Sequence, residues 1–123
     1  MAGVTTRKPA AAVRELPHPE LADIRLENVL AALADPLRLA VVRTLAECGE
    51  SALTCSALEL PVSKSTSTHH FRVLRESGVI TQDYRGTAKM NALRRADLDT
   101  LFPGLLDSVL AAAAREPAGG AAR

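Results

Sequence analysis

A capped helix with two chemically different faces, between residues 63 and 78, constrains the fold of this chain most strongly. At about 100° of rotation per residue, one stripe of this helix is polar and consists of Ser65, Thr68, His69, Arg72 and Glu76. The opposite side carries Ser67, Phe71 and Leu74, with His70 and Ser77 at its margins. Ser63 is a suitable N-cap, and Gly78 supplies the positive-φ residue that ends a helix. The pattern predicts a helix that packs on one side and presents short polar groups on the other, as a DNA-reading helix or an ordinary solvated surface helix does.

The residues after this helix favour the DNA-reading interpretation. Residues 79–85 and 88–93 are two short segments of β-branched, aromatic and apolar residues, separated by Gly86 and Thr87. A glycine at the first central position is typical of a tight hairpin turn, so these segments predict a β-hairpin with Arg85 and Lys89 near its tip. A basic hairpin that follows a reading helix is the arrangement called a winged helix, in which the hairpin contacts the DNA backbone or minor groove.

The charge distribution supports the same interpretation. Between residues 63 and 95 there are two anions, Glu76 and Asp83, and seven cations: Lys64, Arg72, Arg75, Arg85, Lys89, Arg94 and Arg95. The whole chain carries a net charge of only +1, so the remaining residues are net acidic. A near-neutral chain with its positive charge gathered on one pair of elements predicts a localised site for a polyanion, with double-stranded DNA as the partner.

Length and composition narrow the class of protein. A chain of 123 residues, 47% hydrophobic but only 2% aromatic, predicts one small domain with an aliphatic, mainly helical core. No apolar run approaches the roughly 20 residues that span a bilayer, and we expect a cytoplasmic protein. The sequence lacks a Ser-His-Asp set, a glycine-rich phosphate loop and paired acids in a plausible cleft, so we do not expect an enzyme, and we expect no cofactor.

The order of elements can be read along the chain. We expect a flexible arm over residues 1–19, one domain over residues 20–114 and a flexible tail over residues 115–123. Within the domain the expected elements are four helices, a two-stranded hairpin and a last helix, a mainly α (α+β) winged helix-turn-helix. The first helix covers residues 20–34, and the reading helix is the fourth.

Local signals mark the other helices. Asp35 and Pro36 predict the N-cap and first turn of the second helix, which Gly49 ends. Thr54 is expected to cap a short third helix over residues 54–59, which makes a helix-turn-helix with the reading helix. Asp97 is expected to cap the last helix, which should kink or split at Pro103 and Gly104.

Both ends of the domain carry more apolar surface than a small core can cover. We therefore expect a homodimer through the first and last helices, with an interface that includes Leu21, Ile24, Leu101, Leu105, Leu106 and Val109. The alternative is a monomer in which the last helix covers its own core.

Three runs resemble the ArsR/SmtB-type winged-helix transcriptional regulators: residues 34–45 (ADPLRLAVVRTL), residues 62–80 (VSKSTSTHHFRVLRESGVI) and the hairpin with Arg85, Gly86 and Thr87. The resemblance covers residues 20–112. It implies a homodimeric repressor, released by an inducer, that binds an inverted-repeat operator. From the reading helix it implies contacts by Ser65, Thr66, Thr68, His69 and Arg72. To these we add Lys64 on the same helix and Arg85 and Lys89 on the hairpin as expected DNA contacts. The resemblance places His70 at a histidine position of the family, where a packed, hydrogen-bonded role is favoured over DNA contact.

The sensor sites of that family are incomplete in this chain. Members that bind metals use cysteine pairs in the third helix, or Asp and His residues in the last helix. In this chain the expected third helix has only one cysteine, Cys55. The last helix has Asp97, Asp99 and Asp107 but no histidine, so we expect no metal site. Cys48 and Cys55 are candidates for a thiol switch, and small buried hydrophobes are the simpler interpretation. The alternative function is a co-regulator or activator that works with a separate sensor protein.

Overall fold

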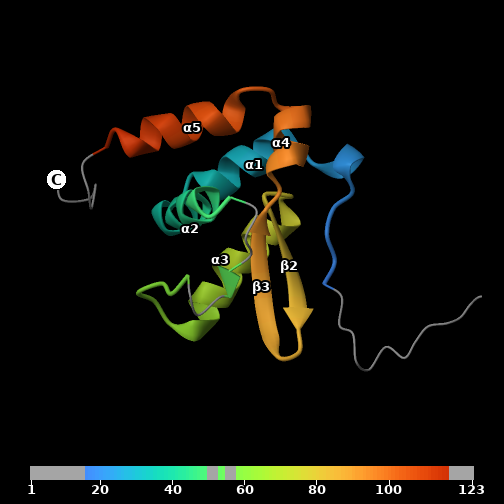
Figure 1. The fold of residues 1–123 in the computed structure, drawn as a ribbon, viewed down its shortest axis with the longest axis vertical. Coiled ribbons are helices and arrows are strands. Elements are labelled where there is room, and N and C mark those ends of the chain that lie inside the picture. Colours follow the sequence, from blue (N-terminus) through green and yellow to red (C-terminus); the bar gives the residue numbers. More distant parts are fainter. Residues whose placement is uncertain (1–15, 50–52, 55–57, 117–123) are drawn as a thin grey trace, which may run out of the picture.

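The computed structural model describes residues 16–49, 53–54 and 58–116 of the chain. Helices α1, α2, α4 and α5 gather at one end, and helix α3 and the hairpin of β2 and β3 extend from them toward the other (Figure 1). The expected winged helix-turn-helix fold is confirmed. One hydrophobic core joins the group of helices to helix α3 and the hairpin. It includes Val29, Leu33, Val42, Leu45, Phe71, Leu74, Val79, Ile80, Leu98 and Leu106. Among the described residues, no helix has the length and apolarity needed to cross a membrane.

The first expected helix, over residues 20–34, is shorter than the sequence indicates. A 3-10 helix, η3 (Leu21–Asp23), comes first, and α1 (Leu26–Leu33) begins only after extended backbone at Ile24 and Arg25. This extended backbone places the side chain of Ile24 in the core, where it is 6% exposed. Helical spacing of the apolar residues therefore predicted the burial of Ile24, Val29 and Leu33 but not one continuous helix.

Helix α2 (Pro36–Glu47) begins as predicted. One carboxylate oxygen of Asp35, Oδ2, accepts hydrogen bonds from the backbone N–H groups of Leu37 at 2.8 Å and Arg38 at 3.1 Å. The proline at the first helical position has no N–H that would need a partner. Cys48 is the C-cap, and Gly49 follows with φ +66°, so the predicted end is also confirmed.

Helix α3 (Lys64–Glu76) leads directly into the sheet. Strands β2 (Ile80–Arg85) and β3 (Ala88–Leu93) form the predicted hairpin, with Ile80 opposite Leu93 and Arg85 opposite Ala88. A two-residue strand, β1 (Leu53–Thr54), pairs antiparallel with β3, giving the sheet order β1-β3-β2. Thr54 thus lies in a strand instead of capping a helix. Residues 55–57 of the expected third helix lie outside the described part, and Leu58 lies in a turn.

The last expected helix is split, as its Pro103-Gly104 pair predicts. Helix α4 (Arg95–Leu101) ends before Pro103, and α5 (Leu105–Ala114) begins after Gly104, whose φ is +82°. The prediction of Asp97 as the cap was wrong, because α4 begins at Arg95. Asp97 lies in the first turn, where it accepts a hydrogen bond from Arg94 Nε at 2.9 Å.

The residues before η3 lie against the body of the domain. Residues 17–19, which we call the N-terminal strap, run beside β2 (Figure 1). Arg75 Nε donates to the carbonyl oxygen of Pro17 at 3.1 Å, and Arg94 Nη1 donates to that of Pro19 at 2.9 Å. The backbone N–H of Gln82 donates to His18 Nε2 at 2.9 Å. These three residues therefore do not belong to a flexible arm; residues 1–15 and 117–123 lie outside the described part.

Candidate nucleic-acid interface

Helix α3, the reading helix, begins at a hydroxyl cap. Ser63 Oγ accepts a hydrogen bond from the backbone N–H of Thr66 at 3.2 Å and donates one to Thr66 Oγ1 at 3.0 Å. The cap is exposed, so the unpaired N–H groups of the first turn face solvent. Such an end attracts anions, because the helix dipole and the free N–H groups both favour negative charge.

The two predicted faces of the reading helix are confirmed. Its buried residues are His70, Phe71, Leu74 and Arg75. Its exposed residues are Lys64, Ser65, Thr66, Thr68, His69, Arg72 and Glu76. Every residue of this helix that we expect to contact DNA is therefore accessible. Hydroxyl, imidazole and guanidinium groups are among those that hydrogen-bond to base edges and phosphates in the major groove.

His70 lies at the edge of the core, as expected. It is 8% exposed, and its Nδ1 lies 3.1 Å from Nη1 of Arg38 and 4.0 Å from Oδ2 of Asp35. Since an arginine only donates, Nδ1 accepts this hydrogen bond. His70 therefore anchors the reading helix to the start of α2, whereas its neighbour His69 faces solvent.

The hairpin of β2 and β3, which we call the wing, ends in a tight turn at Gly86, whose φ is +62°. Arg85 is exposed next to this turn. Lys89 is half-buried, and its Nζ lies 5.6 Å from the centre of the Tyr84 ring. A cation held over an aromatic face keeps its charge while its side chain is restrained. The wing thus presents two cations near its tip.

Three of the seven cations counted from the sequence have polar or acidic partners within the same chain. The guanidinium of Arg75 is buried, and its Nη1 donates to Gln82 Oε1 at 2.7 Å. Arg94 pairs with Asp97 at 2.9 Å, and Arg95 pairs with Asp99 at 3.5 Å and with Asp107. The positive surface available to DNA is therefore smaller than the sequence suggested, and it is supplied by Lys64, Arg72, Arg85 and Lys89.

A buried polar chain connects the reading helix to the wing, and it was not predicted from the sequence. It begins with the hydrogen bond from Arg75 to Gln82 Oε1. Gln82 Nε2 then donates to Asn91 Oδ1 at 2.8 Å, and Asn91 Nδ2 donates to the carbonyl oxygen of Leu53 at 3.1 Å. Gln82 and Asn91 are both 0% exposed. Buried polar groups in a complete network fix one arrangement, since alternatives would leave a group without its hydrogen bond. The one sequence signal is an amide residue on each strand, Gln82 and Asn91, at positions that face each other across the hairpin.

The residues expected at a dimer interface fall into two groups. Ile24 and Leu106 are 6% and 2% exposed within the single chain, so they belong to its core and have little surface left for a partner. Leu101, Leu105 and Val109 are half-buried. Leu21 is 40% exposed, and α1 exposes two further leucines that we did not assign, Leu26 at 43% and Leu30 at 44%.

The thiols and acids do not assemble a site within the described residues. Cys48 is half-buried with a free thiol, and Cys55, its expected partner in a thiol switch, lies outside the described part. Across residues 16–49, 53–54 and 58–116, no three His, Cys, Asp or Glu side chains lie close enough together to hold a metal ion.

Comparisons with known proteins agree with this geometry. Residues 33–83 match a family of helix-turn-helix domains. An uncharacterized HTH-type transcriptional regulator of Bacillus subtilis (strain 168), YceK, is 32% identical over 88 residues, which cover 67% of this chain and 83% of YceK. The crystal structure of an ArsR family transcriptional regulator is similar, with a TM-score of 0.57, 25% identity, and coverage of 68% of this chain and 90% of that one. The crystal structure of the transcriptional repressor BigR from Xylella fastidiosa is also similar. Its TM-score is 0.50 and its identity is 28%, with coverage of 63% of this chain and 85% of that one.

A polar reading helix beside a basic wing defines a winged helix-turn-helix DNA-binding protein. The chain belongs to the ArsR family of transcriptional regulators, as the curated relative and the solved structures together show. That family consists of DNA-binding regulators, not of enzymes.

Proposed function

We propose that this regulator is a repressor that binds an inverted-repeat operator as a homodimer. The observation that carries the proposal is the reading helix, whose exposed face holds Thr68, His69 and Arg72 beside the cations of the wing. The likeness to a solved transcriptional repressor, BigR, supports the repressor role. Because its proposed ligand is operator DNA, we place the regulator in the cytoplasm.

Each part of the surface has a distinct role in this proposal. The reading helix enters the major groove, where Arg72 and His69 hydrogen-bond to base edges or phosphates. Arg85 and Lys89 on the wing contact the backbone beside it and contribute affinity without sequence information. Bound across a promoter, the protein would exclude polymerase.

The exposed leucines of and before α1 support the homodimer in this proposal. Leu26 and Leu30 stand one helical turn apart on α1, each more than two-fifths exposed, with Leu21 close before them in sequence at 40%. Paired across a two-fold axis, such an apolar face buries itself against its copy. The two reading helices then meet two half-sites about one helical turn of DNA apart.

Fluorescence anisotropy on the gene's own upstream DNA, against a scrambled duplex and across a salt series, tests DNA reading. We expect tight binding to the first duplex only. Arg72→Ala should weaken it by about 1–3 kcal/mol. Arg43→Ala is the matched control, because Arg43 is an exposed arginine on α2 beside α5, away from the reading helix. Equal weak binding to both duplexes would overturn the proposal in favour of a co-regulator that depends on a separate sensor protein.

Light scattering tests the dimer. The wild-type protein should show twice the chain mass of 13.0 kDa, and Leu30→Glu should show the mass of one chain. Leu30→Ala, which keeps the surface uncharged, is the control for folding. A wild-type mass of one chain would refute the homodimer.

A further inference from the structure

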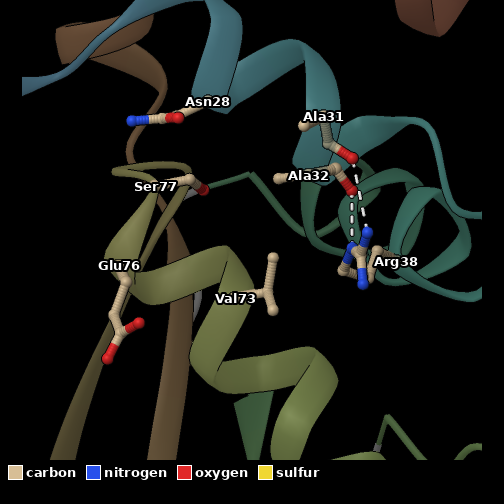
Figure 2. A pocket seen from close by; sticks show the side chains of 7 residues that line it. All are labelled: Asn28, Ala31, Ala32, Arg38, Val73, Glu76 and Ser77. Carbon is tan, nitrogen blue, oxygen red and sulfur yellow. Dashed lines mark hydrogen bonds between the residues drawn. The ribbon is translucent and has the colours of Figure 1, made fainter.

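One arginine side chain connects three helices. From the first turn of α2, Arg38 Nε donates to the carbonyl oxygen of Ala32 at 2.8 Å, and Nη2 donates to that of Ala31 at 3.3 Å. Its remaining terminal nitrogen, Nη1, donates to His70 Nδ1 at 3.1 Å. Figure 2 shows the guanidinium reaching both carbonyl groups of α1. We call this group, Arg38 with Ala31, Ala32 and His70, the joint.

The partners in the joint suit a guanidinium. Ala31 and Ala32 lie in the last turn of α1, where carbonyl oxygens lack a full set of helical partners and carry the negative end of the helix dipole. The planar fork of Arg38 fits this pair of acceptors and holds its third donor in a fixed direction. The direction of that donor then fixes the imidazole of His70, and with it the reading helix.

Beside the joint, the surface between α1 and α3 is open, although Leu33 of α1 shares the core with Phe71 and Leu74 of α3. A groove of about 320 Å³ separates the two helices there, lined by Asn28 and Ala31 on one side and by Val73 and Glu76 on the other. Figure 2 shows these side chains around the open space, with Arg38 at one end. Side chains that border an open groove make few contacts across it, so they add little to the spacing of the two helices there. On this side, the hydrogen bonds of the joint therefore add a direct link between α1 and α3 to the packing of the core.

We infer that Arg38 and His70 are positioning residues that set the spacing between half-sites which the regulator accepts. The inference rests on the proposed homodimer. Helix α1 carries the exposed leucines of the proposed dimer face, Leu26 and Leu30, so a rigid link from α1 to the reading helix fixes the reading helix relative to the two-fold axis. Neither residue is expected to touch DNA.

The test uses the full-length protein on duplexes that carry the same inverted repeat with its spacer shortened or lengthened by one and two base pairs. A single half-site duplex completes the series. Each base pair rotates one half-site about the DNA axis relative to the other, since about 10 base pairs make one turn. Wild-type affinity should therefore fall by about tenfold or more for each wrong spacing, a loss comparable to that from a mismatched base pair.

Three variants separate the joint from general structural roles. Arg38→Lys keeps the charge but loses the fork, and His70→Leu keeps the bulk but loses the acceptor. Both should flatten the spacing profile while half-site affinity stays within about twofold of wild type. His70→Asn places an amide oxygen where Nδ1 stands, so it should restore the steep profile.

The outcomes are distinct. A steep wild-type profile that Arg38→Lys and His70→Leu share would overturn the inference but not the proposed function. A parallel loss on every duplex, the half-site included, would also overturn it, because that is the result of damaged folding. A flat wild-type profile would refute the proposed dimer on an inverted repeat, and the inference with it. Circular dichroism and light scattering on each variant confirm helix content and mass.

Discussion

Replacing Gly78 with alanine should destabilise the protein far more than the same change at another positive-φ glycine. Gly78 ends the reading helix with φ +89°, where its N–H donates to Arg75 O at 3.1 Å and the N–H of Val79 donates to Leu74 O at 3.0 Å. A Cβ built on Gly78 would stand 2.6 Å from Cγ1 and 2.7 Å from Cδ1 of Ile24. The N-terminal segment therefore passes this turn at a distance that only glycine permits.

The magnitude has two parts. A left-handed conformation costs an alanine about 1–2 kcal/mol relative to glycine. Overlap with Ile24, a core residue that is 6% exposed, adds about 1–3 kcal/mol, typical of an overpacked interior. Together they make about 2–5 kcal/mol, a large fraction of the about 5–15 kcal/mol that stabilises a small domain.

Urea unfolding followed by circular dichroism measures this loss. All variants are compared at one protein concentration, because the stability of the proposed dimer depends on it. Gly104→Ala is the control: its φ is +82°, and no atom lies within 4 Å of the added Cβ, so only the backbone cost remains. Adding Ile24→Ala to Gly78→Ala removes the overlapping atoms, and the double variant should lose less than the sum of the singles. Equal losses at Gly78 and Gly104 would refute the overlap.

Three further predictions concern the cap, the buried chain and the wing. Burial alone would raise the pKa of Asp35, but hydrogen bonds from the backbone N–H groups of Arg38 and Leu37 hold this pKa below the usual 3.8. The ionised Asp35 cap therefore stabilises the fold above pH 3.8, and this stabilisation is lost as the pH falls below that value. Asp35→Ala should lower the free energy of unfolding at pH 7 by about 1 kcal/mol, with the two proteins converging in acid; parallel curves in acid would contradict this. Gln82→Leu removes an acceptor of the buried Arg75 guanidinium and should cost about 2–3 kcal/mol in urea unfolding; a loss under about 0.5 kcal/mol would mean that the chain is dispensable. Arg85→Ala should reduce the slope of log affinity against log salt by about 1, and an unchanged slope would remove the wing from the interface.

The elements that the sequence predicted well are those with a local chemical signal. Ser63 and Asp35 cap their helices through their own side chains, and Gly78 and Gly86 adopt the positive φ that their turns require. Such signals act within a few residues, so they can be recognised in the sequence without knowledge of the fold. The exposed face of the reading helix followed from helical spacing for the same reason.

The features that the sequence missed depend on contacts between distant residues. Arg75 looked like one more DNA-facing cation, yet its partners are Pro17 and Gln82, one of them 58 positions away. The break before α1 arises because Ile24 must reach Gly78, which spacing along one helix does not reveal. Leu106 lies on the predicted apolar stripe, but only the fold decides whether that stripe meets the chain's own core or a second copy.

The N-terminal strap has a consequence for how the sequence can change over evolutionary time. Arg75 and Arg94 bind the strap through the main-chain carbonyl oxygens of Pro17 and Pro19, and only His18 contributes a side chain. Since every residue type carries a carbonyl oxygen, substitutions at positions 17 and 19 leave these acceptors in place. Substitutions are therefore tolerated at positions 17 and 19 of the strap and restricted at the two arginines that bind it. A library randomised at positions 17 and 19 should retain folded protein, and one randomised at positions 75 and 94 should be largely depleted of it.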